Sequence, residues 1–378
     1  MTVPPFTRAA RAARSLGGEV LPLRPSPRLF SSFELWPWYI FYLPVTAHWL
    51  RLSVRHRSPT LPTIVNPLME AGGLYGESKA RILSQLGAEA RRWLAPFTTA
   101  DTASVSDPTG DLDRALAAMN DAGLGFPLVA KPDIGCRGTG VRVIDDAVKL
   151  SDYLSLFPRG ERVVLQTLVL DEREAGVLYV RRPDERQGCI FSLTLKSFPS
   201  VVGDGRSTLR ELILQNPRAR RISSVYFERH ADQLARVLGR GELFRLVFTG
   251  NHCKGAVFRN GNLHVTPAMT ERFDGIARDI PEFYFGRFDV RFSSLAALKR
   301  GEDFTIIEVN GAGSEATHIW DRRTKLIEAY RTLFKQVEYL FEIGNLNRAR
   351  GFRPAGPIDL LRLCDRQRRL MARYPLSR

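Results

Sequence analysis

Two short stretches in the last third of the chain place polar side chains at the spacing of a strand. In GRFDVRF, Arg287, Asp289 and Arg291 alternate with apolar residues. In FTIIEVNG, Glu308 and Asn310 end an apolar run just before a glycine-rich turn. Side chains two residues apart on a strand point to the same face, so each set shares a face. If the two strands pair, two carboxylates, an amide and two arginines converge.

Such a cluster has a specific chemistry. Carboxylate and amide oxygens suit Mg²⁺ held together with substrate phosphates, and they predict Asp289, Glu308 and Asn310 as metal ligands. Arginines beside them would neutralise charge that grows on a transferred phosphoryl group. The alternative is a cross-strand ion-pair network on a solvated sheet face. The interleaved apolar residues favour the metal site, because they indicate that the other face of the sheet is covered.

A second group of residues could bind phosphate. The apolar stretch FPLVAKP delivers Lys131, DIGCRGTG follows it, and VRVI at 141–144 completes a predicted hairpin. Backbone N–H groups in a glycine loop form an anion-binding concavity, and a lysine supplies a point charge. The loop is neither GxGxxG nor GxxxxGK[ST], and a glycine hairpin without a ligand is an equal alternative. The predicted phosphate contacts are Lys131, Gly135, Gly138, Thr139 and Gly140.

Taken in order, these features resemble the ATP-grasp superfamily. The resemblance rests on Lys131-Pro132 with its glycine loop, then Asp289, then Glu308-x-Asn310. It is nearest to the D-alanine–D-alanine ligase-like proteins, and VVGDGRSTLRELI at 201–213 looks like a segment of cyanophycin synthetase. It covers roughly residues 75–342. It implies an α+β fold of two lobes with ATP between them, here preceded by a short helical, aromatic segment.

The resemblance also implies roles for single residues. Lys79 in GESKARIL matches an early ATP-binding lysine of the family. Gln166 and Leu168 fall where the hinge backbone contacts adenine. Glu174 is the best match for the ribose-binding glutamate, with one residue more than the usual spacing. Lys196 ends a predicted strand. It would either reach the phosphates or be a surface lysine at the end of the strand.

The metal-site residues are matched as well. By resemblance, Asp289, Glu308 and Asn310 are magnesium ligands, and Arg287 stabilises the transferred phosphate. Lys131 and Arg291 complete the predicted catalytic set. A lone histidine in TGNHCKGA, His252, is left open as a substrate contact, a general base or a structural residue.

The activity that this resemblance implies is an ATP-dependent carboxylate–amine ligase with Mg²⁺. A small carboxylate and an amine would be joined in an amide or peptide bond through an acyl phosphate. Two alternatives stay open: an ATP-grasp kinase or other phosphotransferase, and a non-catalytic, basic, membrane-associated nucleotide-binding protein. One stretch departs from the ligases, because GAGSEATHIWD replaces their proline-glycine loop after Asn310. This loop is expected to face the acceptor substrate.

The composition limits the remaining choices. The chain has 378 residues, 44% of them hydrophobic, which is enough for two or three lobes with a sizeable core. Its net charge of +15 favours anionic partners without choosing among them. No RNA-binding motif is visible, so nucleic acid is not expected. Four dispersed cysteines with no CxxC pair predict neither disulfides nor a thiolate zinc site, and they indicate a cytoplasmic protein. The oligomeric state is not determined.

The start of the chain has a different character. Residues 1–30 carry five arginines and one acid without an apolar signal core, and they predict a basic arm. Residues 35–57, LWPWYIFYLPVTAHWLRLSVRHR, are too interrupted to span a membrane. Their aromatic residues and arginines suit a helix at a membrane interface, which would make the protein peripheral to the inner face of the membrane. A helix buried under the next lobe is the alternative.

Periodicity supplies the elements that must position these residues. Further strands are predicted at 162–169, 175–183 and 188–198, and helices at 207–215, 269–280 and about 321–342. The predicted divisions are a basic arm with an aromatic helix (1–57), an N-terminal lobe (58–110), an ATP-grasp small lobe with the glycine loop (111–170), a large lobe with the metal site (171–343) and a basic C-terminal tail (344–378).

Overall fold

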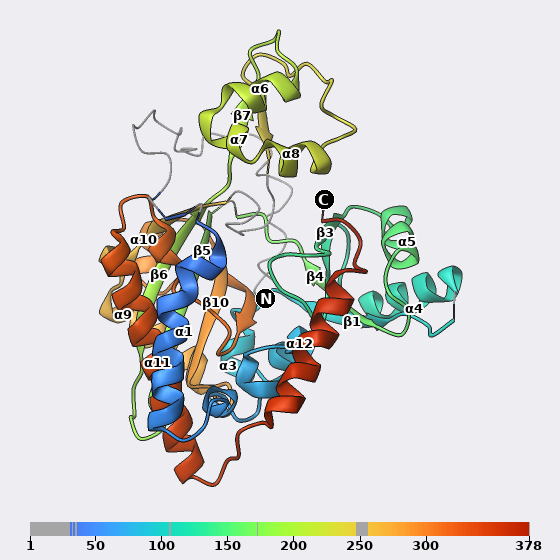
Figure 1. Ribbon diagram of the computed structural model, residues 1–378. Helices are drawn as coiled ribbons and strands as arrows, with labels where there is room; N and C mark the ends of the chain where they lie inside the picture. Colours follow the sequence, from blue (N-terminus) through green and yellow to red (C-terminus); the bar gives the residue numbers. More distant parts are fainter. Residues whose placement is uncertain are drawn as a thin grey trace, which may run out of the picture.

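The structure is a computed structural model, which describes residues 31–377 except 32, 35, 106, 172 and 247–255. Two antiparallel sheets lie in separate lobes, each with helices packed against it (Figure 1). The predicted α+β class with two lobes is therefore confirmed. His252 lies outside the described residues.

The small lobe is built on a four-stranded sheet. Its strands, in spatial order, are β1 (Phe97–Asp101), β4 (Arg162–Thr167), β2 (Leu128–Pro132) and β3 (Arg142–Ile144). The predicted hairpin of β2 and β3 is confirmed, whereas β1 was not predicted. Helices α4 (Pro108–Asp121) and α5 (Ala147–Ser155) pack on the sheet through a core that includes Met119, Leu150 and Tyr153.

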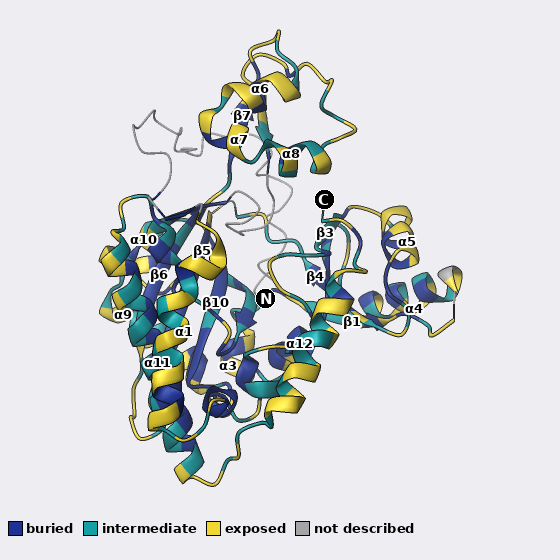
Figure 2. Ribbon diagram, viewed as in Figure 1, coloured by how far each residue is buried: buried dark blue, intermediate teal, exposed yellow. Residues whose placement is uncertain are grey.

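The large lobe is built on a five-stranded sheet. Its strands, in spatial order, are β11 (Phe304–Asn310), β10 (Phe285–Phe292), β5 (Arg173–Val180), β6 (Cys189–Ser197) and β9 (Val257–Asn260). One face is covered by α2 (Lys79–Ser84), α3 (Ala88–Arg91), α9 (Pro267–Arg278) and α10 (Leu295–Lys299). Figure 2 shows the sheet buried beneath its helices. The predicted covering of one face by apolar packing is therefore present.

A bulge in β11 decides which side chains face the core. The register with β10 shifts between Asp289 and Val290, so that Asp289 pairs with Glu308 while Val290 pairs with Ile306. Ile307 is the extra residue, and one extra residue reverses the alternation of faces. Ile306 and Val309 therefore both join the core. Glu308 and Asn310 are left on the opposite face.

A small subdomain projects from the large lobe (Figure 1). It consists of β7 (Ser200–Val202), α6 (Leu209–Gln215), α7 (Pro217–Arg221), α8 (Ser223–Arg229) and β8 (Leu243–Arg245) around its own core. Thr208 caps α6, whose helix was predicted at 207–215, in a capping box with Glu211. A short 3₁₀ helix, η5 (Asn262–His264), follows β9.

Two long helices flank the large lobe. The aromatic helix predicted in 35–57 is confirmed as α1 (Trp38–Arg55), which lies along α11 (Leu326–Ala349). Among the described residues, no helix combines the length and hydropathy that a membrane span requires. The 3₁₀ helices η2 (Leu61–Ile64), η3 (Glu70–Gly73) and η6 (Thr317–Trp320) lie in the connections.

Two predicted boundaries fall inside helices. The division at 343 lies within α11, which continues to Ala349, and a further helix, α12 (Pro357–Met371), follows it. The apolar spacing of 321–342 identified the helix but not its polar last turns. The division at 110 lies within α4, which begins at Pro108. The segment predicted as a basic tail is therefore largely helical.

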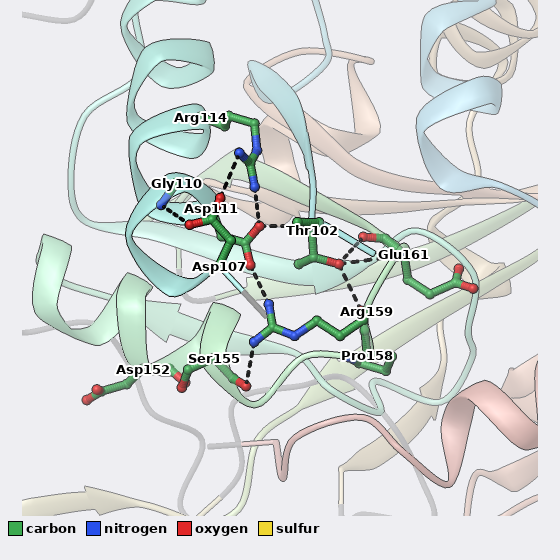
Figure 3. A network of polar contacts seen from close by, with 11 residues as sticks. Thr102, Asp107, Gly110, Asp111, Arg114, Asp152, Ser155, Pro158, Arg159 and Glu161 are labelled. Carbon is green, nitrogen blue, oxygen red and sulfur yellow. Dashed lines mark hydrogen bonds and ion pairs between the residues drawn. The ribbon is translucent and has the colours of Figure 1, made fainter. Parts of the chain in front are cut away.

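A buried carboxylate joins α4 to the edge of the small-lobe sheet (Figure 3). Asp111 is 1% exposed and is paired with Arg114 and Arg159. It also accepts the backbone N–H of Ala103 at 2.7 Å. Thr102 closes the same junction by donating its hydroxyl to the carbonyl oxygens of Pro158 and Glu161. These polar groups satisfy one another, so the network is a structural one.

We expect Asp111→Ala to destabilise the protein by about 2–3 kcal/mol, because the change strands a buried N–H and removes charge-assisted hydrogen bonds. Urea unfolding followed by circular dichroism measures this. The control is Asp113→Ala, an exposed acid on the same helix, which should change the stability by no more than about 0.5 kcal/mol. Equal effects of the two substitutions would contradict a structural role for the network.

Candidate active site

The paired strands β10 and β11 gather the predicted metal ligands on one face of the large-lobe sheet. Asp289 lies directly opposite Glu308, and Arg287 lies opposite Asn310. The predicted pairing of these two strands is therefore observed. The side-chain nitrogen of Asn310 is buried and has no hydrogen-bond partner. Oxygen and nitrogen of an amide are assigned from their partners, so this amide is available to present either atom.

Asp289 is held ionised by two cations. Arg287 donates from Nε to Oδ1 at 2.9 Å and from Nη2 to Oδ2 at 3.1 Å, and Lys196 Nζ lies 2.9 Å from Oδ1. Burial would raise the pKa of Asp289, but the charges of Arg287 and Lys196 outweigh it and hold that pKa at about 2. Gly176 on β5 lies opposite Asp289. A Cβ at Gly176 would be 3.0 Å from Arg287 Cδ. The missing side chain leaves room for this pair.

Glu174 belongs to the same network. Its Oε1 accepts from Lys196 at 2.8 Å, and its Oε2 lies 3.1 Å from Arg291 Nε. Lys196 therefore bridges Glu174 and Asp289, and burial of the ammonium, which would lower its pKa, is outweighed by the two carboxylates. The ribose role of Glu174 stays a prediction. In the described structure this carboxylate anchors Arg291 and Lys196, and Lys196 in turn contacts Asp289.

Lys131 reaches from the small lobe to the bulge of β11. Its ammonium donates to Gln166 Oε1 at 2.8 Å and to the carbonyl oxygen of Ile307 at 2.9 Å. Burial lowers the pKa of Lys131 to about 8, although Glu308 acts in the opposite direction. Gln166 is buried inside the small-lobe sheet, and Leu168 lies just beyond the end of β4. Their predicted adenine contacts stay predictions.

Lys79 lies at the first position of α2, directly after the N-cap Ser78. Asp133 fixes this helix start by accepting from the Ser78 hydroxyl and from the backbone N–H of Ala80. The ammonium of Lys79 is 3.7 Å from Glu308 Oε1 and donates to the carbonyl oxygen of Gly135. The structure thus brings the early lysine, the glycine loop and a predicted metal ligand together.

Sequence reasoning missed Glu77, which precedes the Ser78 cap. Its Oε2 accepts the backbone N–H of Gly311 at 3.3 Å, directly after Asn310. Burial raises the pKa of Glu77 to about 7, against the opposing charge of Lys79. A single glutamate before a helix cap has no distinctive pattern, so nothing in the sequence marked it.

The glycine loop is covered by the C-terminal segment. Tyr374 donates to the carbonyl oxygen of Ile134 at 2.7 Å and stacks on Phe157, and Ser377 donates to that of Gly138 at 2.7 Å. Gly138 and Gly140 have φ values of 65° and 74°, which L side chains rarely adopt. Helix α12 leads from the large lobe to this point (Figure 1). The segment 372–377 therefore forms a strap over the predicted phosphate loop.

The polar side chains of the loop after Asn310 form hydrogen bonds with other residues of the protein. Glu315 accepts from Tyr42 of α1 and from Trp320 Nε1, while Ser314 donates to Gly311. His318 is buried against Ser192 Oγ at 2.6 Å, and burial lowers the pKa of His318 to about 4. The expectation that this loop faces the acceptor stays a prediction.

The donor set fits a hard cation. Asp289 and Glu308 supply ionisable oxygens, and Asn310 supplies an amide without a hydrogen-bond partner. Within the described part of the chain, no three His, Cys, Asp or Glu side chains form a metal cluster by themselves. The amide and the oxygens of a bound phosphate would therefore have to complete the coordination. A wide hollow lined by Arg181, Arg186 and Arg278 includes none of the predicted site residues.

Comparisons with known proteins come from solved structures alone, because no family model and no curated protein matches the chain. A bifunctional glutathione synthetase from Pasteurella multocida matches at 14% identity and a TM-score of 0.33, over 70% of this chain and 38% of that one. The VanG D-Ala:D-Ser ligase from Enterococcus faecalis matches at 12% identity and a TM-score of 0.41, over 73% of this chain and 63% of that one.

This chain thus spans less than two thirds of either of these proteins. The two names agree with the ligase resemblance of the sequence. Because the TM-scores are low, the likeness carries no inference about activity.

We expect the protonation of Glu77 to contribute to the pH dependence of stability. Its folded pKa of about 7 is above the ordinary value of 4.5, so the folded state binds the proton more tightly. This stabilisation is complete below the ordinary pKa and is lost as the pH rises through 7. Glu77→Gln imitates the protonated form. The variant should match the wild type near pH 5 in thermal unfolding and exceed it near pH 8.

Glu89→Gln is the matched control, because Glu89 is exposed. Its melting temperature should follow that of the wild type at both pH values. A Glu77→Gln protein whose difference from the wild type does not change with pH would show that this carboxyl titrates normally.

We expect Tyr374→Phe to loosen the strap without removing its aromatic packing. The lost hydrogen bond to Ile134 should cost about 1 kcal/mol, so amide exchange in residues 133–140 should be roughly fivefold faster. Hydrogen–deuterium exchange with mass spectrometry measures this. Tyr39→Phe, at an exposed tyrosine, is the control and should leave the exchange of the loop unchanged. Unchanged exchange in Tyr374→Phe would mean that the strap does not restrain the loop.

Proposed function

We propose that the protein is an ATP-dependent ligase that joins a carboxylate to an amine in an amide or peptide bond. The observation that carries this proposal is the convergence of two groups from separate lobes. Arg287, Asp289, Glu308 and Asn310 share one face of β10 and β11. Lys131 of the small lobe reaches the same strand at Ile307, and Lys79 reaches Glu308.

The charges of this cluster suit a nucleotide triphosphate. Five cations (Lys79, Lys131, Lys196, Arg287 and Arg291) surround four carboxylates (Glu77, Glu174, Asp289 and Glu308). A protonated Glu77 would leave the cluster more positive at neutral pH. Asp289, Glu308 and Asn310 would hold magnesium, which would supply charge neutralisation for a bound triphosphate. The remaining positive charge supports the binding of phosphate oxygens at this cluster.

The chemistry follows from positioning and charge. A substrate carboxylate oxygen attacks the γ-phosphorus of ATP, the bond to the β,γ-bridging oxygen breaks, and ADP leaves. Lys131 and Arg287 neutralise the charge that develops on the transferred group. An amine then attacks the acyl carbon, phosphate leaves and the amine loses a proton. Water must be excluded while the acyl phosphate exists. The contact of the strap with the glycine loop and that of Lys131 with β11 would help to exclude water.

A phosphotransferase is the second candidate, because the cluster would serve transfer to any acceptor oxygen. The two activities differ in their products. A ligase gives an amide together with ADP and free phosphate, whereas a kinase gives a phosphorylated product and no free phosphate. An ADP-release screen over amino acids and small peptides, followed by mass spectrometry of the products, separates them.

We expect Asp289→Asn and Glu308→Gln each to lower ATP turnover by at least about 100-fold, because each removes charge from the predicted metal site. Magnesium-dependent ATP binding, measured by calorimetry, should weaken in parallel. Glu302→Gln is the matched control, since Glu302 is an exposed acid between the same two strands. Circular dichroism verifies that the variants fold. Folded variants with unchanged binding and turnover would refute the site assignment.

A further inference from the structure

The outer face of α1 is apolar, and no described part of the chain covers it. Leu43 is 67% exposed, Leu50 59% and Val54 79%, and Ile40 and Tyr39 are also exposed. At 3.6 residues per turn these residues fall on one stripe along the helix. Exposed apolar residues are common singly, but a continuous stripe over several turns marks a contact surface.

The opposite face of α1 is packed against the large lobe. Phe41 and Leu52 are buried, and the helix packs on α11 with Phe41 stacked against Tyr330. Tyr42 donates to Glu315, and Trp49 donates to the carbonyl oxygen of Pro59. The helix is therefore fixed in rotation, so it cannot turn the apolar stripe inward.

The charge around the stripe indicates its partner. Arg51 and Arg55 are exposed and lie beside the stripe, and Arg57 follows the end of the helix. Residues 35–69 contain no acidic residue, and the chain carries a net charge of +15. A second copy of α1 would itself bring no carboxylate to Arg51 or Arg55, whereas anionic headgroups would pair with both.

An aromatic residue of the stripe points to the same partner. Tyr39, in the first turn of the helix, is 61% exposed. Tryptophan and tyrosine favour the boundary between headgroups and acyl chains. An amphipathic helix of this kind lies in the plane of the interface with its apolar face buried at the acyl boundary.

We propose that α1 docks the protein on an anionic lipid bilayer. Leu43, Leu50 and Val54 enter the acyl boundary, Tyr39 lies at headgroup depth, and Arg51 and Arg55 pair with lipid phosphates. The proposal is independent of the ligase activity, because α1 lies outside the charged cluster.

The test is co-flotation of the full chain with vesicles made of equal parts phosphatidylcholine and phosphatidylglycerol, compared with vesicles of phosphatidylcholine alone. We expect binding to the anionic vesicles that weakens with added salt. The triple variant Leu43→Gln, Leu50→Gln and Val54→Gln should reduce the bound fraction at least tenfold, since glutamine preserves the helix and removes the apolar contact.

The matched control replaces two leucines and one valine that are equally exposed elsewhere. Val148→Gln, Leu263→Gln and Leu361→Gln should bind the vesicles like the wild type. Arg51→Gln with Arg55→Gln should reduce the salt dependence of binding. Circular dichroism shows whether each variant is folded.

Three outcomes would overturn the proposal. In the first, the wild type does not float with anionic vesicles. In the second, the triple variant floats as well as the wild type. In the third, the wild type does not bind lipid and is a dimer in sedimentation velocity, whereas the triple variant is a monomer. The last outcome would assign the stripe to self-association.

Discussion

Two carboxylates buried side by side at the centre of the large-lobe sheet set the main constraint on this structure. Glu174 is 4% exposed and so is Asp289. An ion of this size costs several kcal/mol to remove from water, and two like charges in a low dielectric repel each other. Lys196 lies between them and contacts both, while Arg287 and Arg291 each hold one. The sheet can bury these acids only because three cations share one face.

That arrangement depends on the bulge at Ile307. With uninterrupted alternation, Ile306 and Glu308 would share a face, and either the isoleucine would leave the core or the glutamate would enter it. The bulge separates them, so Ile306 packs inward and Glu308 faces Asp289. It also frees the carbonyl oxygen of Ile307, which accepts from Lys131. One inserted residue thus orients a predicted metal ligand and connects the small lobe to the large one.

The sequence could predict features that depend on the periodicity of apolar residues and on residue type. Alternation placed Arg287, Asp289 and Arg291 on one face, and the KP-glycine pattern located the hairpin of β2 and β3. The bulge was not predictable, because FTIIEVN permits either alternation and the choice depends on packing against β10. The buried Glu77 and the contacts of Glu174 with Lys196 and Arg291 were not predicted for a similar reason. Their environment is made by residues distant in sequence, such as Gly311 and Lys196. The strap escaped because residues 372–377 have no regular period.

The departure from the ligase pattern after Asn310 and the aromatic N-terminal helix belong to one interface. The unusual loop after Asn310 does not stand alone, because Glu315 accepts from Tyr42 of α1. Trp320, which also donates to Glu315, packs against Phe41 of α1 with ring centroids 4.8 Å apart. The aromatic N-terminal helix and GAGSEATHIWD are therefore two sides of one interface. A proline-glycine loop would offer neither the carboxylate nor the indole that α1 contacts. The position of the loop after Asn310 thus depends on a helix that lies outside the region of resemblance.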